Sequence, residues 1–263
     1  MNTLFIIPAR AGSKGLPSKN ILPVWGKPLI DYTIEQAKAA VKEVGASDRD
    51  IWVTSDSPQV AERARVHFVQ FDDRPKHLAG DETPIIPVLQ HVLNHANRTN
   101  IVFERGAVPY DSICLLQPTS PVRPDGLIAG CLSIMEANPD CDSVITVLPT
   151  PERYHPTAAL KPASSGRVTW YGGHFEYCRR QDLTPVYYRS GQVYLFRAEL
   201  LHRDEPTIYG ERIASNIRTD PNEAINIDSE ADLAQFTAYL KSRPQQCSQL
   251  ANDTSNTPVV ATN

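Results

Sequence analysis

The sequence lacks the features that mark membrane, secreted or general nucleic-acid-binding proteins. No apolar stretch approaches the roughly 20 residues needed to span a bilayer. Pro8 interrupts the first apolar run at once, so we expect neither a signal peptide nor a membrane partner. The formal net charge is −4, with 26 Lys and Arg against 30 Asp and Glu, which argues against nucleic acid as a partner. The 5 cysteines form no C-x-x-C pair, which favours a reducing, cytoplasmic location.

A short apolar run followed by a basic, glycine-containing loop opens the chain. Residues Leu4 to Ile7 are typical of a strand buried on both faces, and Pro8 ends the strand pairing. Glycine lets backbone N–H groups approach an anion closely, while long cationic side chains neutralise phosphate oxygens. The loop therefore predicts a polyphosphate site, with a basic surface turn as the alternative. Its cationic and glycine residues are Arg10, Gly12, Lys14, Gly15 and Lys19.

The spacing within this loop is not that of the two common nucleotide-binding loops. The NTPase loop requires Gly-Lys followed by Ser or Thr, whereas the order here is Ser13-Lys14-Gly15. The dinucleotide loop requires three glycines in the pattern G-x-G-x-x-G, which the loop does not contain. The loop therefore predicts a phosphate site of another kind.

Segments of strand and helix character alternate along the 263 residues, of which 41% are hydrophobic. This alternation predicts an α/β protein in which helices flank a mainly parallel sheet. Ligands of such sheets bind beyond the carboxyl ends of the strands, which is where the basic loop lies. After the opening strand, we expect strands at 51–54, 67–71, 112–117, 142–148 and 224–228, and helices at 28–45, 58–66, 84–97, 125–137 and after Ser229, with Ser229 and Asp232 as a capping box.

Two segments interrupt the alternation. Residues 150–189 are rich in Pro, Tyr, Gly and basic side chains without a helical period, and so long a connector usually has a function. Residues 245–263 are polar and rich in Asn, Ser and Thr, which predicts disorder. We therefore expect one domain over 1–243, an inserted arm at about 150–190 and a tail at 244–263.

The opening loop resembles the N-terminal signature of the cytidylyltransferases that activate sialic acids (CMP-sialic acid synthetases, including the legionaminate type). In that family, Pro-Ala-Arg is followed by Gly-Ser-Lys-Gly-Leu-Pro-x-Lys-Asn, and nearly every position is matched. The likeness extends from Phe5 to about Leu240 and implies a Rossmann-like nucleotidyltransferase fold. Three further motifs follow in the family's order: Arg74-Pro-Lys-His-Leu-Ala-Gly-Asp81, Leu116-Gln-Pro-Thr-Ser-Pro-Val-Arg123 and Ile225-Asn-Ile-Asp228.

The resemblance implies transfer of CMP from CTP to the anomeric hydroxyl of a 2-keto sugar acid, with release of pyrophosphate. A nine-carbon, sialic-acid-like substrate is the leading class. Charge neutralisation and positioning then fall to the catalytic residues Arg10, Lys14, Lys19 and Asp228. The implied cofactor is Mg²⁺, held by Asp228 with Asn226, which replaces a family Asp, in the outer shell. The family's arm implies a homodimer.

The resemblance also implies which residues bind the two substrates. From the residues alone, Asp81 is equally well explained as a local turn partner, and Arg123 as a contact at a helix end. For Gln117 the ligand role is favoured over that of a buried amide bonded to the backbone. The expected nucleotide-binding residues are Ala9, Arg10, Ala11, Gly12, Ser13, Lys14, Lys19, Asn20, Arg74, Leu78, Ala79, Asp81 and Gln117, and the expected sugar-binding residues are Gln117, Ser120, Arg123, Arg180, Gln181 and Tyr188.

Departures from the family pattern leave other functions open. Ser190 and Gln192 replace an Asn and a small residue at the expected sugar site, which puts the identity of the acid in doubt. An eight-carbon ulosonate or a phosphonate or phosphate substrate is the alternative, and the basic Arg179-Arg180 pair keeps the latter possible. A CTP-binding module without turnover is the other alternative, favoured only by the carboxylate missing at Asn226.

Overall fold

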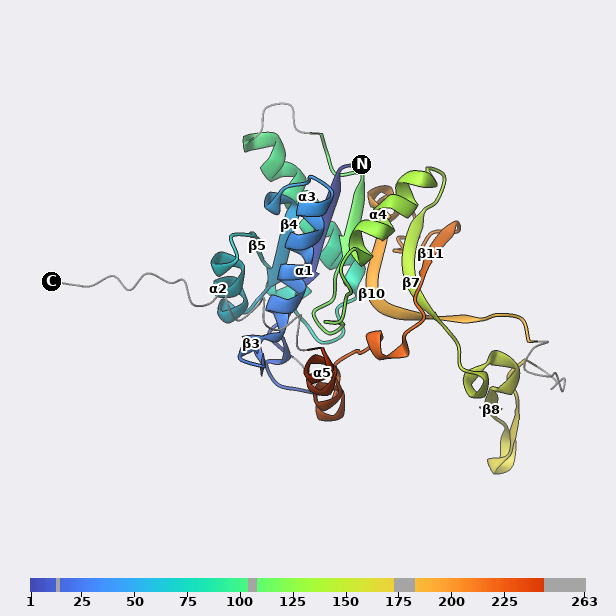
Figure 1. Cartoon of the computed structure of the whole chain (residues 1–263). Helices are drawn as coiled ribbons and strands as arrows, with labels where there is room; N and C mark the ends of the chain where they lie inside the picture. Colours follow the sequence, from blue (N-terminus) through green and yellow to red (C-terminus); the bar gives the residue numbers. More distant parts are fainter. Residues whose placement is uncertain (13–14, 104–107, 173–182, 244–263) are drawn as a thin grey trace.

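The computed structural model describes residues 1–12, 15–103, 108–172 and 183–243, which form a seven-stranded sheet flanked by helices (Figure 1). The strand order is β11-β7-β10-β6-β1-β4-β5. All neighbours pair in parallel except β10, which is antiparallel to both β6 and β7. The predicted mainly parallel α/β sheet is therefore confirmed. The strands are β1 (Thr3–Pro8), β4 (Ile51–Ser55), β5 (Gln70–Asp73), β6 (Ser112–Leu115), β7 (Ser143–Pro149), β10 (Tyr187–Arg197) and β11 (Ile213–Ile217).

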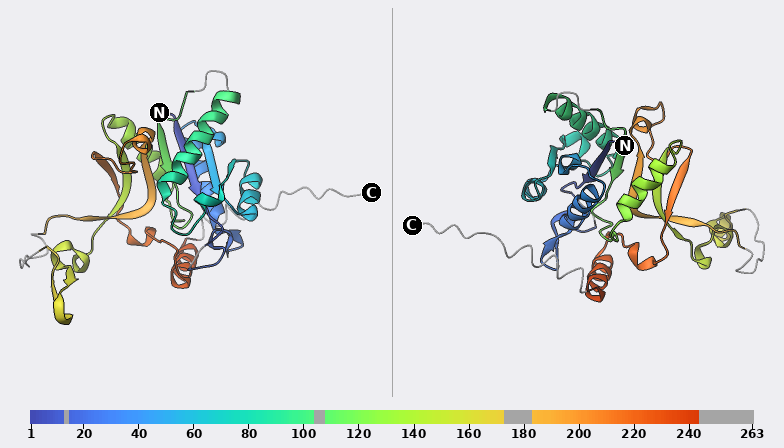
Figure 2. Two further views of the ribbon diagram at one scale, coloured as in Figure 1. Left: turned by 180° about the vertical axis from the view of Figure 1, so that it is seen from behind. Right: turned by 45° about the horizontal axis from the view of Figure 1, so that its top comes forward.

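Helices cover both faces of the sheet, which is why β1 is apolar at successive positions. Phe5 and Ile7 belong to a core cluster shared with α1 (Leu29–Glu43), α2 (Pro58–Val66) and α4 (Leu127–Ala137). The alternate residues Leu4 and Ile6 pack instead with α3 (Ile85–Phe103), which lies over the opposite face (Figure 2). Side chains alternate between the faces of a strand, so a strand covered on both sides needs a continuous apolar run.

A third apolar cluster fixes α5 (Glu230–Ser242) below the carboxyl ends of the strands. Phe236 of α5 contacts Tyr32 of α1 edge to face, with ring centroids 5.2 Å apart, and Ile227 is fully buried beside them. The predicted capping box is confirmed, because the Ser229 side chain accepts from the Asp232 backbone and the Asp232 carboxylate accepts from the Ser229 backbone. The segment before α5 is therefore anchored on both sides.

Several predicted element boundaries are wrong. The strand expected at 67–71 starts only at Gln70, because Phe68 adopts a left-handed conformation (φ 58°) that ends α2 first. Helix α3 continues to Phe103, well beyond the expected end at Asn97. Residues 224–228 form no strand, and their buried isoleucines anchor an irregular segment. The edge strand beside β7 is β11, whose side chains are exposed or half-buried.

The predicted arm leaves the sheet between β7 and β10 and extends away from the domain (Figure 1). It carries a small antiparallel pair, β8 (Leu160–Pro162) and β9 (Val168–Trp170), among short 3₁₀ turns. Another short pair, β2 (Pro23–Val24) and β3 (Lys27–Pro28), precedes α1. Within the described ranges no helix is both long and apolar enough to cross a membrane. Further 3₁₀ segments lie at Lys19–Ile21, Lys76–Leu78, Ala198–His202 and Pro221–Glu223.

Candidate active site

A cleft of about 510 Å³ opens at the carboxyl ends of β1, β5 and β6. These strands are parallel members of one sheet, so the loops that follow them gather at the same end. The four sequence motifs, which are far apart in the chain, all contribute to the lining. The described residues that line it are Pro8, Arg10, Gly15, Lys19, Asn20, Arg74, Leu78, Gly80, Thr83, Ile85, Val88, Gln117, Pro118, Thr119 and Asp228.

The loop after β1 is held at its base by side-chain hydrogen bonds to its backbone. The Asn20 amide donates to the carbonyl of Arg10 at 3.0 Å. The backbone N–H of Ala11 donates to the Asp56 carboxylate at 2.7 Å. Ala9, which begins the loop, is fully buried and itself donates to the carbonyl of Thr54. The loop therefore starts from a fixed position beside the cleft.

The two described cations of this loop each pair with a carboxylate from another motif. Lys19 Nζ donates to the carbonyl of Ile227 at 2.6 Å and to Asp228 Oδ1 at 2.9 Å. Arg10 pairs with Asp81, so the predicted turn partner bonds to a predicted phosphate-binding residue. The Lys19 side chain is 12% exposed, whereas that of Asp228 is 66% exposed. The ion pairs thus join the loop to the two other walls of the cleft, where both cations remain available to an anion.

Arg74 forms a buried wall of the cleft. Its guanidinium donates to the carbonyl of Thr54 at 2.8 Å and to the Thr54 hydroxyl at 3.3 Å. Burial lowers the pKa of Arg74, while the nearby carboxylate of Asp72 acts in the opposite direction. Leu78 also lines the cleft, but Ala79 is not among the described lining residues. This part of the cleft, where nucleotide-binding residues are expected, therefore has a cationic side and an apolar side.

The segment around Asp228 faces Gly15 across the cleft and bonds to the loop after β6. Asn226 Nδ2 donates to Asp228 Oδ2 at 2.5 Å, and Ser120 Oγ donates to Asn226 Oδ1 at 3.3 Å. The backbone N–H of Ile227 donates to the carbonyl of Thr119 at 2.7 Å. A Cβ added at Gly15 would lie 2.4 Å from the carbonyl oxygen of Asp228. Only glycine permits so close an approach, which explains Gly15 in the loop.

The predicted metal pair fits a hydrated Mg²⁺ ion in its chemistry. Asp228 is the carboxylate among the described lining residues, and Asn226 contributes an amide beside it. Mg²⁺ commonly keeps several waters and binds through one or two carboxylates together with substrate phosphates. The exposed carboxylate of Asp228 supplies only part of the oxygen ligands that Mg²⁺ needs. Phosphate oxygens of the substrate and water would have to supply the others.

Arg123 has a structural role in place of the predicted contact with a sugar carboxylate. Its guanidinium donates to the carbonyls of Gln192 at 2.6 Å and Gln117 at 2.8 Å. It also donates to the Thr33 hydroxyl at 3.2 Å and to the Gln36 side chain at 2.9 Å. Burial lowers the pKa of Arg123 to about 9. With these acceptors occupied, Arg123 holds the backbone behind Gln117, which itself lines the cleft.

The two positions that depart from the family pattern are buried. Ser190 Oγ lies 2.7 Å from the Thr146 hydroxyl and 2.9 Å from the Gln192 side-chain oxygen. The Gln192 amide donates to the carbonyl of Val122 at 2.8 Å. Ser190 and Gln192 therefore form a hydrogen-bonded layer inside the protein. Tyr188 lies nearer the start of β10 than these two residues. Its side chain is 38% exposed and is not among the described lining residues.

Four predicted site residues, Ser13, Lys14, Arg180 and Gln181, lie outside the described residues and stay predictions. Gly12 and Ser120 lie near the cleft without appearing in its described lining. Asp56 was not predicted, although it follows β4 directly at the carboxyl end of the sheet. That position was a usable signal, because polar residues directly after parallel strands converge at one end of the sheet.

Comparisons with known proteins agree with this geometry. The sequence profile described as cytidylyltransferase matches residues 4–244. The CMP-N,N'-diacetyllegionaminic acid synthase of Legionella pneumophila is 31% identical over 245 residues, which cover 89% of this chain and 94% of that protein. The N-acylneuraminate cytidylyltransferase of Streptococcus agalactiae serotype V is 27% identical over 240 residues, covering 91% of this chain but 54% of the relative. The chain thus spans about half the length of that streptococcal relative.

A solved structure of CMP:2-keto-3-deoxy-manno-octonic acid synthetase, in complex with CTP, has a similar fold. It aligns with a TM-score of 0.65 and 18% sequence identity, covering 92% of this chain and 99% of that one. This level of identity supports the fold alone, whereas the profile match extends over nearly the whole described chain. The chain belongs to the cytidylyltransferase family, a family of nucleotidyltransferase enzymes.

Proposed function

We propose that this chain transfers CMP from CTP to the anomeric hydroxyl of a nine-carbon, sialic-acid-like 2-keto acid and releases pyrophosphate. One observation carries the proposal: a single cleft at the carboxyl ends of the parallel strands is lined by residues of all four motifs. It has a basic loop on one side, a cationic and apolar wall on another, and an exposed carboxylate opposite. That combination suits a nucleoside triphosphate with a metal ion.

The cations of the cleft support the phosphate-transfer step. Negative charge grows on the leaving pyrophosphate as the bond to the α-phosphorus breaks, and fixed positive groups stabilise that charge. Arg10 and Lys19 already lie in the cleft, each in an ion pair that a phosphate competes with. Lys14 of the same loop is the third predicted cation. The nucleotide then replaces Asp81 and Asp228 as the partner of these side chains.

Asp228, with Asn226 beside it, would hold the Mg²⁺ ion. When bound, this ion adds positive charge at the phosphate oxygens and helps to orient the reacting groups. The chain supplies the positioning: Asn226 bonds to the Asp228 carboxylate and fixes its direction, and Lys19 pairs with the same carboxylate until the nucleotide binds. Burial of Ile227 keeps the backbone between these residues in place.

The acceptor acid would bind on the Gln117 side of the cleft. Gln117 lines the cleft, and its amide can both donate to and accept from sugar hydroxyls. Arg123, from behind, holds the backbone carbonyl of Gln117. The names of the relatives supply three candidate acids: N-acylneuraminate, N,N'-diacetyllegionaminate and, from a Campylobacter jejuni relative that is 29% identical over 199 residues, pseudaminate.

We further propose a homodimer through the arm. The arm exposes several large apolar side chains, and a lone extended arm buries little of them against its own domain. Clustered exposed apolar residues usually mark an interaction surface. Those of the arm and its base are Tyr154, Leu160, Val168, Tyr171, Tyr187 and Tyr188.

The decisive experiment is pyrophosphate release from CTP and Mg²⁺ with a panel of acids. The panel contains N-acetylneuraminate, legionaminate, pseudaminate, an eight-carbon ulosonate and a phosphonate. We expect turnover with one nine-carbon acid, and an Asp228→Asn variant should lose most of it while still folding. Turnover only with the eight-carbon acid or the phosphonate would overturn the acceptor assignment. CTP binding without any release would favour the non-catalytic module that the missing carboxylate at Asn226 suggests.

A further inference from the structure

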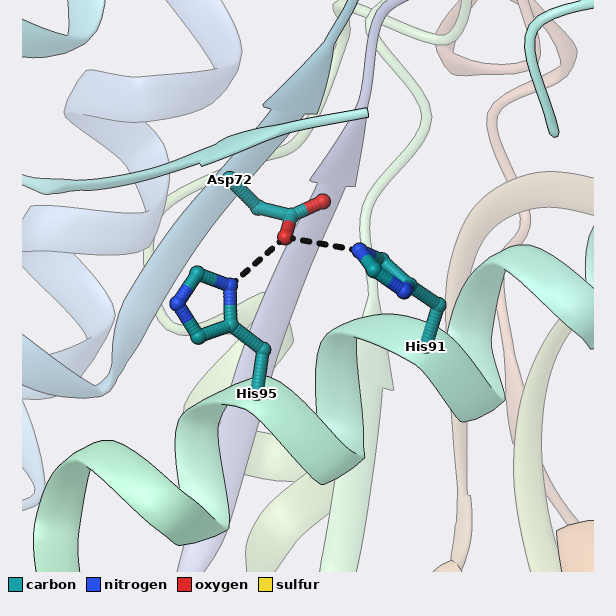
Figure 3. Close-up of side chains that lie close together, drawn as sticks. All are labelled: Asp72, His91 and His95. Atoms are coloured by element: carbon teal, nitrogen blue, oxygen red, sulfur yellow. Dashed lines mark hydrogen bonds and ion pairs between the residues drawn. The ribbon is translucent and has the colours of Figure 1, made fainter. Parts of the chain in front are cut away.

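A second cluster of polar side chains lies where β5 meets α3, and none of its members is among the described lining residues of the cleft. It consists of Asp72 on β5 with His91 and His95 on successive turns of α3, all directed toward one point (Figure 3). His91 Nε2 lies 3.1 Å and His95 Nδ1 2.7 Å from the same carboxylate oxygen, Asp72 Oδ1. One ligand atom from each residue lies within 4.8 Å of the other two. The predicted cytidylyltransferase chemistry uses none of them.

The donor set points to a transition metal. Two imidazoles and one carboxylate are the ligands preferred by Zn²⁺ and similar borderline ions, whereas Mg²⁺ prefers oxygen alone. Tetrahedral Zn²⁺ with bonds of about 2.0–2.2 Å separates its ligand atoms by roughly 3.3–3.5 Å. The 3.1 Å and 2.7 Å contacts with Asp72 therefore have to lengthen when an ion binds, while all three ligand atoms already lie within 4.8 Å of one another. To bind a metal ion, each imidazole has to present an unprotonated ring nitrogen, so the nitrogen that faces Asp72 must not carry the proton in the metal-bound state.

Neighbouring residues already orient two of the three side chains, Asp72 and His95. The second oxygen of Asp72, Oδ2, accepts from the Thr54 hydroxyl at 2.7 Å, so the carboxylate keeps Oδ1 turned to the histidines. The ring of His95 packs edge to face on Trp52, with centroids 4.9 Å apart. Outer contacts of this kind fix the orientation of metal ligands. The cluster is therefore preorganised without an ion.

The carboxylate of the cluster is buried, whereas the two histidines are partly open to solvent, which suits the binding of an ion from solution. The Asp72 side chain is 1% exposed, whereas those of His91 and His95 are 29% and 45% exposed. A buried carboxylate raises the local negative potential, and the open histidine side provides an entry path and room for a water as fourth ligand. Histidines at i and i+4 share one helix face, so α3 presents both to β5 without distortion.

We propose that Asp72, His91 and His95 form a binding site for one Zn²⁺-class divalent ion, separate from the nucleotide cleft. Bound there, the ion joins α3 to β5, which is an edge strand paired only with β4 in the sheet. The bound ion would thus cross-link the short edge strand β5 to helix α3, which covers it. The proposal does not depend on the function of the cleft.

Zinc titration of tag-free, chelator-treated protein tests this proposal. Calorimetry should show one Zn²⁺ ion per chain and a raised Tm, and the His91→Ala and His95→Ala variants should bind about tenfold or more weakly. Two controls should keep full affinity: His202→Ala, which removes an exposed histidine elsewhere, and Asp228→Asn, which removes the carboxylate of the cleft. Equal affinity in the His91 or His95 variants, or no binding by the unaltered chain, would overturn the site.

A measurement on the unaltered chain guards against variants that fail to fold. Diethyl pyrocarbonate modifies accessible imidazoles, and peptide mass analysis locates the modified residues. We expect Zn²⁺ to protect His91 and His95 while His202 reacts at an unchanged rate. Zinc binding without this protection would place the ion elsewhere and show that the cluster is only hydrogen-bonded.

Discussion

Gly15 and the carbonyl of Asp228 are in contact across the cleft. We expect Gly15→Ala to lower kcat/KM by on the order of 100-fold, because a misplacement of about 1 Å at a reacting centre can cost that much. The added Cβ would lie 2.4 Å from the Asp228 oxygen, so the loop or the 226–228 segment has to shift. Steady-state kinetics with saturating Mg²⁺ measures the change.

Gly12 provides the matched control in the same loop. A Cβ there would meet its nearest atoms, on Arg10 and Asp81, at 3.8 Å and 3.9 Å, which is ordinary contact. If the contact with Asp228 is what requires glycine, Gly12→Ala should lower kcat/KM much less than Gly15→Ala, and any loss that remains measures the expected part of Gly12 in nucleotide binding. Equal losses in both variants would mean that the loop needs glycine for its flexibility and that the contact with Asp228 is unimportant.

A substitution of Asn226 tests whether this position affects the affinity for Mg²⁺. In the unaltered chain, Asn226 Nδ2 lies 2.5 Å from Asp228 Oδ2. The variant Asn226→Asp replaces this amide by a carboxylate and so adds a negative charge beside Asp228. We expect the Mg²⁺ concentration for half-maximal activity to fall by roughly tenfold, because carboxylate count sets the affinity of such sites. Asn222→Asp, which adds the same charge at an exposed position outside the described lining, should leave it unchanged. An unaltered Mg²⁺ dependence in Asn226→Asp would remove this position from the metal site.

At the scale of elements, Asp142 fixes the start of β11 beside β7. Its buried carboxylate accepts from the backbone N–H groups of Glu211 and Arg212, both at 2.9 Å, and pairs with the Arg212 and Arg203 side chains. We expect Asp142→Asn to lower the free energy of unfolding at pH 7 by about 2 kcal/mol, since one amide NH₂ would then face these donors. Denaturant unfolding measures this free energy, and Asp140→Asn, at an exposed position, is the control.

The pH dependence of this contribution has a defined sign. The backbone N–H of Arg212, followed by its side chain and the N–H of Glu211, holds the pKa of Asp142 well below the ordinary value of 3.8. The unfolded chain therefore binds the proton first as the pH falls, so the stabilisation is complete above about pH 5 and declines below pH 4. The difference between Asp142→Asn and the unaltered chain should shrink over that acid range. A constant difference from pH 7 to pH 3 would contradict the assignment.

Sequence patterns predicted the elements whose signals are local. The apolar run Leu4 to Ile7 indicates a strand covered on both faces, and the pair Ser229 and Asp232 indicates the start of α5. The rule that ligands bind at the carboxyl ends of parallel strands also predicted the end of the sheet at which the basic loop and the cleft lie.

Features that depend on distant partners could not be predicted. The guanidinium of Arg123 is buried by acceptors such as the carbonyl of Gln192, 69 positions away, and nothing near Arg123 signals this. His91 and His95 share a helix face, but Asp72 joins them only through the packing of β5 on α3. β11 was missed because an exposed edge strand does not need an apolar pattern.

At the scale of the whole molecule, the arm controls assembly in our proposal. The double variant Leu160→Glu/Val168→Glu places two charges on apolar side chains that are 51% and 63% exposed. If the arm packs on a partner, the dissociation constant of the dimer should rise by about 100-fold, because an unpaired buried charge is strongly unfavourable. Sedimentation velocity over a concentration series measures this.

A control for this prediction lies outside the arm. Phe68→Asn removes an apolar side chain that is 84% exposed, and Asn tolerates the left-handed backbone of that position. We expect it to leave the sedimentation profile unchanged. A chain that sediments as a monomer before any substitution would remove the dimer from the proposal.

The arm enters and leaves the sheet at neighbouring strands. Because β7 and β10 pair antiparallel, everything between Pro149 and Tyr187 is, in topological terms, the loop of one hairpin. Such a loop can be lengthened, shortened or exchanged without altering the order of any strand or the position of the cleft. Selection can therefore remodel the arm independently of the nucleotide-binding half, and a chimaera that exchanges it between relatives requires only two junctions, side by side at one end of the sheet.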